Sequence, residues 1–223
     1  MPCRTVWSAQ RQILPLRSSC SRATVTALPP ATILPISVRS RLQGTPGASP
    51  AFRFIGNLGK ATKPLIAAVQ GNAVGVGTTM LLHCDLVYLA ENARLITPFV
   101  NLALVPEAAS SWLLPARIGH ARAYAMFALG EPMDAATAFA CGLANAVVPV
   151  DEVRSKAMAA AVTLTKRPTG SLSHTKALMR EHQRIAAKIG EESALFRERL
   201  QTAEAREAFS AFAERRQPDF SKV

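Results

Sequence analysis

Residues 63–99 read KPLIAAVQGNAVGVGTTMLLHCDLVYLAENARLITPF and carry the pattern that decides the fold. The run at 63–71 is short and apolar, contains β-branched residues and is bounded by Pro64 and Gly71, which predicts a buried strand. A glycine-punctuated turn at 72–84 leads into an apolar helix, and two further short strands are predicted at 85–91 and 93–99. Strand and helix alternate, which indicates an α/β fold.

The same alternation continues outward from this stretch. Residues 52–62 have apolar positions at helical spacing. Helices are predicted at 121–130, closed by Gly130, and at 131–142, with Asp134 as N-cap and Gly142 at the end. A strand is expected at 143–149, followed by three helices at 151–165, 169–188 and 191–216. We therefore predict an α/β core over 48–150 and an all-helical region over 151–223.

The first 47 residues differ in character from the rest. They mix Arg, Ser, Pro and Thr, contain no acidic residue and show no sustained helical or strand period. This composition is typical of a disordered segment or an organelle transit peptide, and also of a coding sequence read in the wrong frame. We interpret residues 1–47 as a leader outside the core.

The net charge of +11 belongs largely to the first part of the chain. Residues 1–84 hold nine Lys or Arg and no Asp or Glu, whereas 85–223 hold seventeen basic and fifteen acidic residues. No helix-turn-helix, zinc-finger or RNA-binding aromatic pattern accompanies this charge, so we expect no nucleic-acid partner. No apolar run approaches the roughly 18 residues of a membrane span, so we expect no membrane partner.

Metal binding is not expected from the cysteine and histidine spacing. The residues concerned are Cys3, Cys20, Cys84, Cys141, His83, His120, His174 and His182. They form no paired ligand pattern, and we interpret the cysteines as free thiols of a reducing compartment.

The glycine-punctuated turn is the first candidate site. Gly71, Gly75 and Gly77 lie between a predicted strand and a predicted helix, where backbone N–H groups can face a ligand. The alternative is a tight turn that binds nothing. The spacing is neither that of a dinucleotide-binding loop nor that of a P-loop, which argues against a nucleotide phosphate.

Glu107 is the second candidate. It is the single acidic residue of the apolar stretch 96–112, and we expect it at the start of a helix with Ser110 and Ser111 in the first turn. The alternative is that Glu107 has no chemical role and is only a favourable N-terminal residue, stabilised by the helix dipole. If the site is buried, loss of solvation raises the carboxyl pKa and makes the group a better base near neutral pH.

Residues from about 50 to 223 resemble the enoyl-CoA hydratase/isomerase (crotonase) superfamily. The elements that carry the resemblance are KPLIAAVQG, GVGTTMLLHCD, LPARIG, the Gly-Glu pair at 130–131, GLANAVVP and the closing EAFSAFAERRQPDF. The resemblance implies a crotonase-like (ClpP/crotonase) ββα spiral core, N-terminally incomplete here, with an all-helical C-terminal region. It also implies an acyl-CoA thioester as substrate, with no separate cofactor.

In that family two backbone N–H groups hold the thioester oxygen and stabilise an enolate. The resemblance places one of these donors at Val76, with Gly75, Gly77, Phe99 and Leu104 as substrate-binding residues. The two glutamates of the family's hydratases correspond to Thr79 and Phe99 here, so both carboxylates are absent.

Around Glu107 the chain is similar to peroxisomal-type Δ3,Δ2-enoyl-CoA isomerases, in which the corresponding glutamate is the lone acid/base. The resemblance therefore implies an enoyl-CoA isomerase with Glu107 as its catalytic residue. A hydratase or other crotonase reaction is one alternative. A catalytically silent subunit is another, because the family's first oxyanion donor has no counterpart in residues 1–50.

The missing motif has a candidate explanation in the leader. If Pro30 to Ser37 are encoded by suitable codons, a shifted frame translates as Gly-Asn-Asp-Ile-Ala-Asp-Phe, which is close to the family's motif at that place. We hypothesise that residues 1 to about 47 are a frame-shifted N-terminus. By resemblance we expect a homotrimer or homohexamer in a bacterial cytoplasm, with a mitochondrion or peroxisome as the alternative in a eukaryote.

Overall fold

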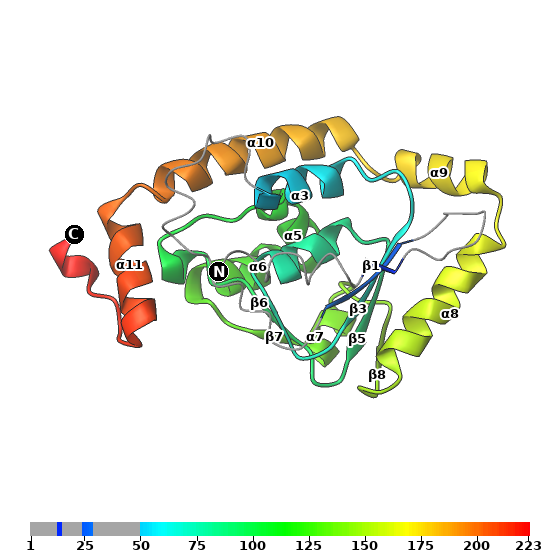
Figure 1. Ribbon diagram of the computed structural model, residues 1–223, viewed down its shortest axis with the longest axis horizontal. Helices are drawn as coiled ribbons and strands as arrows, with labels where there is room; N and C mark the ends of the chain where they lie inside the picture. The colour runs from blue at the N-terminus through cyan, green and yellow to red at the C-terminus, as the bar shows by residue number, and fades with distance from the viewer. Residues whose placement is uncertain (1–12, 15–23, 29–49) are drawn as a thin grey trace, which may run out of the picture.

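The computed structural model describes residues 13–14, 24–28 and 50–223. Its larger sheet has the strand order β1-β2-β3-β5-β8 (Figure 1). These strands are Ile13–Leu14, Thr24–Leu28, Leu65–Val69, Leu86–Ala90 and Ala146–Val148. Strands β2, β3, β5 and β8 run parallel, with Ile66 opposite Leu86 and Tyr88 opposite Ala146, and only β1 is antiparallel to its neighbour. The α/β fold and the strands expected around 63–71, 85–91 and 143–149 are thereby confirmed.

Both faces of the central strands are buried, which explains their continuous apolar sequence. In β3, Ala67 and Val69 point into the main core cluster, whereas Ile66 and Ala68 pack in a second cluster that includes Val153. The helix on that second face is α8 (Val153–Thr165), at the right of Figure 1. The sheet is therefore an inner layer with packed side chains on each side.

The leader was not expected to contain regular structure, yet β1 and β2 lie within it. Strand β2 pairs in parallel with β3 along its whole length, from Thr24 opposite Leu65 to Leu28 opposite Val69. The segment 24–28 is too short to show a sustained strand period, and three of its five residues are β-branched, which favours pairing with a neighbouring strand. The remainder of the predicted leader lies outside the described residues.

A second sheet of the described residues has the order β4-β6-β7 (Asn72–Val74, Arg94–Ile96 and Met133–Asp134). Strand β4 runs parallel to β6, and β7 is antiparallel to β6. Helix α4 (Val76–Thr79) and the 3-10 turn η1 (Met80–His83) follow β4 directly. This sheet therefore sets the position of the glycine-punctuated turn.

The predicted helix boundaries before residue 150 are largely confirmed. They correspond to α3 (Pro50–Gly59), α5 (Ser110–Ile118), α6 (His120–Tyr124) continued by the π-helix η3 (Ala125–Leu129), and α7 (Ala135–Ala140). Gly130 ends η3 with φ 71°, and the Asp134 side chain accepts a hydrogen bond from the Thr137 N–H at 2.7 Å as the N-cap of α7. A C-terminal glycine and an Asp N-cap are local features, so the sequence pattern predicted both helix ends.

The prediction of three helices over 151–223 is wrong in its boundaries. The structure forms four α-helices there, namely α8, α9 (Thr169–Leu178), α10 (His182–Arg199) and α11 (Ala203–Glu214). Between α9 and α10, the Arg180 guanidinium donates to the carbonyl oxygen and to Nδ1 of His83. Between α10 and α11, Thr202 caps the new helix by accepting from the Ala205 N–H at 3.2 Å. A tertiary contact and a polar cap thus divide the predicted helical runs.

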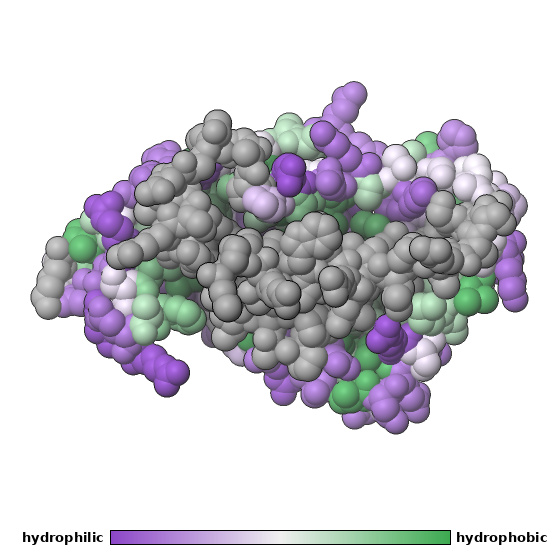
Figure 2. All heavy atoms as spheres, in the orientation of Figure 1, coloured by the Kyte–Doolittle hydropathy of each residue, from purple (hydrophilic) through white to green (hydrophobic). Residues whose placement is uncertain are grey.

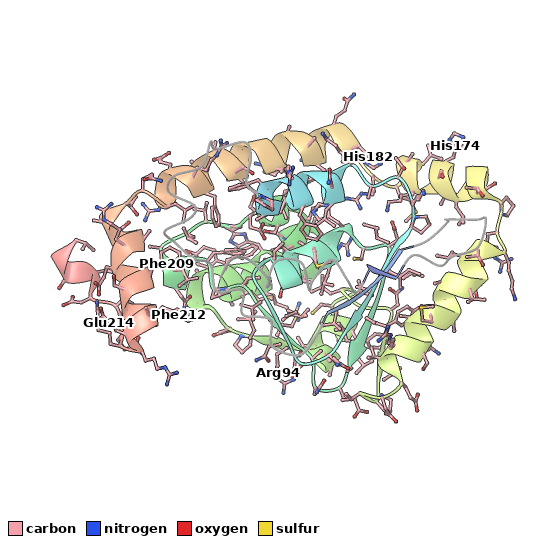
Figure 3. The ribbon with its side chains drawn as sticks, in the orientation of Figure 1. Arg94, His174, His182, Phe209, Phe212 and Glu214 are labelled. Atoms are coloured by element: carbon pink, nitrogen blue, oxygen red, sulfur yellow. The ribbon has the colours of Figure 1, made fainter. Side chains whose placement is uncertain are left out.

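Helix α10 lies alongside α3 at the top of Figure 1. A Cβ added to Gly59 would lie 2.8 Å from Cδ1 of Ile189, so the glycine permits this close approach. His182, at the start of α10, contacts the Gly59 carbonyl oxygen at 3.2 Å (Figure 3). Hydrophilic residues project from the upper edge of the space-filling view, above the first half of α10 (Figure 2). The inner face of α10 is thereby directed at α3 and α5, where the candidate site lies.

An ion pair between the buried Lys176 and the partly exposed Asp85 attaches α9 to the end of the sheet. The Lys176 ammonium group bonds to Asp85 at 2.6 Å and to the Lys63 carbonyl oxygen at 2.7 Å. Asp85 also accepts from the Leu65 N–H at 2.6 Å. Removing Asp85 should be destabilising because it would leave the buried Lys176 ammonium group without its carboxylate partner. Among the helices that the structure describes, none is both long enough and apolar enough to cross a membrane.

Candidate functional site

Glu107 and Thr79 meet in the interior of the molecule. The Glu107 side chain is only 5% exposed, and Thr79 is fully buried in α4. The Thr79 hydroxyl donates to Oε1 of Glu107 at 2.5 Å. The candidate carboxylate is therefore held against the helix that follows the glycine-punctuated turn.

Our expectation that Glu107 occupies a helix start is wrong in its detail. Helix α5 begins at Ser110, and Glu107 lies in the preceding turn, where its carbonyl oxygen accepts from the Ser110 N–H. Ala108 and Ala109 both adopt left-handed conformations, with φ 62° and 58°. This turn separates Glu107 from the first helical turn, and its carboxylate bonds to Thr79 instead of to the helix N–H groups. Ser110 and Ser111 do occupy the first turn of α5, as expected.

The environment of Glu107 favours the protonated form. Burial raises the pKa of the Glu107 carboxyl to about 7, the hydrogen bond from Thr79 opposes this rise, and the nearby Glu192 carboxylate adds to it. A group with a pKa close to neutral can both accept and return a proton at physiological pH. The arrangement therefore suits acid/base chemistry.

The glycine-punctuated turn places Val76 as the first residue of α4. The first N–H groups of a helix have no acceptor within the helix. Gly75 has φ 57° and ψ −118°, a conformation that favours glycine, and its carbonyl oxygen accepts from the N–H groups of Thr78 and Thr79. The Val76 side chain packs against the cluster that contains Ala108 and Ala109. The candidate oxyanion donor and the Glu107 turn thus belong to one neighbourhood.

The other predicted substrate-binding residues have different surroundings. A Cβ on Gly77 would make only an ordinary contact with Ala73, at 3.7 Å. Phe99 and Leu104 are each 5% exposed and lie in the main core cluster, where Phe99 contacts Phe127 with 6.1 Å between ring centroids. Contact of these residues with a substrate stays a prediction.

Sequence reasoning missed Glu192. Its carboxylate, which is part of α10, accepts from the Ala109 N–H at 2.5 Å and from the N–H and hydroxyl of Ser111 at 2.9 and 2.5 Å. Glu192, rather than Glu107, therefore occupies the N-terminus of α5. A signal was present, because Ile185, Ile189 and Glu192 are the buried positions of α10 and follow helical spacing. An acidic residue on that apolar stripe requires a buried partner.

His83 contacts the same turn through Ala108. Its Nε2 lies 2.7 Å from the Ala108 carbonyl oxygen, and its Nδ1 lies 2.9 Å from the Arg180 guanidinium. Arginine can only donate, so Nδ1 accepts and Nε2–H donates to Ala108. Burial lowers the pKa of His83 to about 4, which keeps the ring neutral. Among the described residues, no three His, Cys, Asp or Glu side chains are grouped so that they could hold a metal ion.

The family model described as enoyl-CoA hydratase/isomerase matches residues 49–222. The chain belongs to the enoyl-CoA hydratase/isomerase family. This confirms the resemblance noted in the sequence, and it places the candidate site in a family whose members act on acyl-CoA thioesters.

Similar proteins of this hydratase/isomerase family include both kinds of enzyme. The chain is 35% identical over 160 residues to 2,3-dehydroadipyl-CoA hydratase of Escherichia coli (strain K12), covering 71% of this chain and 63% of the relative. It is 33% identical over 172 residues to enoyl-CoA delta isomerase 2 of Rattus norvegicus, covering 76% of this chain and 44% of the relative. The chain thus spans less than two thirds of the length of either relative.

A solved structure supports the family fold. The crystal structure of an enoyl-CoA hydratase/isomerase from Pseudoalteromonas atlantica T6c aligns with a TM-score of 0.83 and 32% identity, covering 96% of this chain and 86% of that chain. The predicted crotonase-like α/β fold with a helical C-terminal region is confirmed by this likeness.

Proposed function

We propose that this hydratase/isomerase family member is an enoyl-CoA isomerase that converts a 3-enoyl-CoA into a 2-enoyl-CoA. Glu107 removes a proton from C2, and the electron pair of that C–H bond moves toward the thioester carbonyl to form an enolate. The Val76 N–H donates to the enolate oxygen. Glu107 then returns the proton to C4, and the double bond moves from C3–C4 to C2–C3. No water and no second reactant enter the balance.

The observation that carries this proposal is a single available carboxyl group with a pKa of about 7 at the site. Thr79 and Phe99 stand where the resemblance places the two glutamates of hydratases, so no pair of carboxylates is there to activate water. The second buried carboxylate, Glu192, already accepts three hydrogen bonds from Ala109 and Ser111. One free acid/base suits proton transfer between two carbons of the same substrate.

Hydration is the second candidate, because one similar protein is named as a hydratase. Product analysis separates the two reactions, since hydration of a 2-enoyl-CoA yields a 3-hydroxyacyl-CoA and isomerisation leaves the substrate mass unchanged. A catalytically silent subunit would yield neither product. We expect the isomer and no hydroxyacyl product.

The variant Glu107→Gln tests the proposal. Gln keeps the size and an acceptor oxygen for Thr79 but cannot take up the C2 proton, so kcat for 3-hexenoyl-CoA isomerisation should fall by about 10³-fold or more. The control is Glu91→Gln, because Glu91 is exposed. Product formation can be followed by mass spectrometry coupled with NMR of the double-bond protons. Full activity in Glu107→Gln would refute the proposed mechanism.

The same variant has a readout that does not depend on turnover. The folded-state pKa of Glu107 is raised from 4.5 to about 7, so the folded protein binds this proton more tightly than the unfolded chain. The associated stability is present below about pH 4.5 and is lost as pH rises toward 7. At pH 8, the free energy of unfolding of Glu107→Gln should therefore exceed that of the wild type by up to about 3 kcal/mol. Urea unfolding would show this as a higher midpoint. Equal urea midpoints for the wild type and Glu107→Gln at pH 8 would contradict the destabilising effect of a buried charge at Glu107.

Self-association is also proposed from the resemblance, as a homotrimer or homohexamer. Among the described residues, Tyr124 and Leu129 are 61% and 65% exposed, and Phe212 on α11 is 61% exposed (Figure 3). Large exposed apolar side chains are typical of surfaces that another chain covers. Light scattering at several protein concentrations measures the state directly. The expected cytoplasmic location stays a prediction.

A further inference from the structure

Glu192 is a buried carboxylate that the proposed proton transfers do not use. It is 4% exposed on α10, and each of its oxygens accepts at least one hydrogen bond from the start of α5. Three donors are grouped around this one carboxylate; burial raises its pKa, and the hydrogen bonds from Ser111 and Ala109 oppose that rise. All three donors belong to Ala109 and Ser111, so Glu192 acts on this one short segment.

That segment includes the turn that follows Glu107. Ala108 and Ala109 both have positive φ, which is disfavoured for residues with a Cβ. Such a conformation persists only where the surroundings hold it. Glu192 accepts a hydrogen bond from the Ala109 N–H, and His83 donates one to the Ala108 carbonyl oxygen.

We propose that Glu192 is a positioning residue for Glu107. Its carboxylate holds the Ala108–Ala109 turn in the conformation that directs Glu107 at Thr79 and the substrate, and it keeps a second negative charge beside the acid/base. The inference rests on the proposed function, in which Glu107 is the catalytic residue.

The charged and titratable groups around the turn determine whether loss of the Glu192 charge raises or lowers the pKa of Glu107. Glu192 raises the pKa of Glu107, and Thr79 from α4 opposes it. His83 from η1 is neutral, because burial lowers its pKa to about 4. Burial raises the pKa of Glu192, and the hydrogen bonds from Ser111 and Ala109, together with Lys188 on α10, oppose that rise. Removing the Glu192 charge should therefore lower the pKa of Glu107.

The variant Glu192→Gln tests this with Glu191→Gln as its matched control. Gln at 192 turns an NH₂ group toward a donor, so at least one bond to α5 is lost together with the charge. Glu191 is the exposed neighbour on the same helix, where it pairs with Lys188. For Glu192→Gln we expect kcat to fall about tenfold or more with KM nearly unchanged, since misplacement of a reacting group acts on the chemical step. The acidic limb of the pH profile should move to lower pH. Glu191→Gln should match the wild type in both.

Ser111→Ala separates position from charge. It removes one of the three hydrogen bonds and leaves the Glu192 carboxylate in place. We expect a smaller loss of kcat and no movement of the pH profile. This milder variant also tests the inference if Glu192→Gln does not fold, because wild-type kcat in Ser111→Ala would then count against a positioning role.

A direct measurement distinguishes failure of this inference from failure of the proposed function. NMR of protein with ¹³C-labelled glutamate carboxyl groups follows the Glu107 resonance, assigned by its loss in Glu107→Gln. If the wild type lacks isomerase activity, the proposed function fails, and a lower Glu107 pKa in Glu192→Gln still supports control by Glu192. An active Glu192→Gln variant with wild-type kcat and an unchanged Glu107 titration overturns the inference, even if that variant is less stable.

Discussion

Two turns form the candidate site, and they reach unusual backbone conformations in different ways. The turn before α4 places its positive φ at Gly75, which has no Cβ to clash. The turn before α5 places positive φ at Ala108 and Ala109 in succession. In the first turn glycine permits the positive φ. In the second turn, contacts from other segments hold the positive φ of two alanines.

The source of that support differs as well. Around Gly75 the partners are backbone and neighbouring strands, since the Gly75 N–H donates to Ile96 and the Thr78 hydroxyl donates to Ala73. Around Ala108 and Ala109 the partners are side chains from other elements, His83 and Glu192. A local turn that provides backbone N–H groups thus faces a non-local turn that places a carboxylate. We therefore expect the proposed oxyanion donor to keep its position when distant helices change, whereas the position of the proposed acid/base should depend on them.

The largest effect on this comparison should come from Gly75→Ala. A Cβ at φ 57° and ψ −118° is strained even though open space surrounds the position, so the free energy of unfolding should fall by about 1–3 kcal/mol. Gly77→Ala is the control, because its Cβ makes an ordinary contact and Ala favours the helix by about 1 kcal/mol. Urea unfolding measures both. Equal stabilities would show that the first turn does not depend on glycine.

A smaller effect is expected from Thr79→Val. The wild-type Thr79 hydroxyl links the two turns through its hydrogen bond to Glu107. Val fills nearly the same space but cannot donate to Glu107, and the lost hydrogen bond had lowered the Glu107 pKa. The acidic limb of the isomerase pH profile should therefore move to higher pH, with activity at pH 7 reduced and partly recovered at pH 8. Thr79→Ser keeps the hydroxyl and should retain the original profile. An unmoved profile in Thr79→Val would mean that the bond has no influence on the acid/base.

The smallest effect is expected from alanine-to-glycine changes that test for strain in the second turn. Ala109 and Ala157 are both fully buried, but Ala157 is in the helix α8 and Ala109 has φ 58°. Each change to Gly removes one buried methyl group. At Ala109 it also relieves left-handed strain, so Ala109→Gly should destabilise by about 1 kcal/mol less than Ala157→Gly. Thermal unfolding at one pH compares them, and equal losses would argue that the turn carries no strain.

The sequence predicted the features that depend on neighbouring residues. Its apolar runs indicated β3, β5 and β8, and Gly130 and Asp134 marked helix ends that the structure confirms. It also singled out Glu107 as the acidic residue in an apolar stretch. These features rest on period, residue conformation and capping, which act over a few residues.

Other features could not be read from local pattern. The divisions at Arg180 and Thr202 interrupt helical runs because of a contact with His83 in the first case and a cap in the second. The strand at Thr24–Leu28 is too short to show a period and forms by pairing with β3. Burial of Glu192 was visible only as an acid on an apolar stripe, without its partners.

Local sequence patterns were sufficient to predict the α/β order of elements, the glycine turn that leads into α4 and the presence of one acid among apolar neighbours. How that acid is held depends on contacts between distant segments. Thr79, His83 and Glu192 come from separate segments and meet at one turn, where burial raises the pKa of Glu107 to about 7. The physical reason is that hydrogen bonding to distant groups and loss of solvent arise from packing, which the local sequence does not encode.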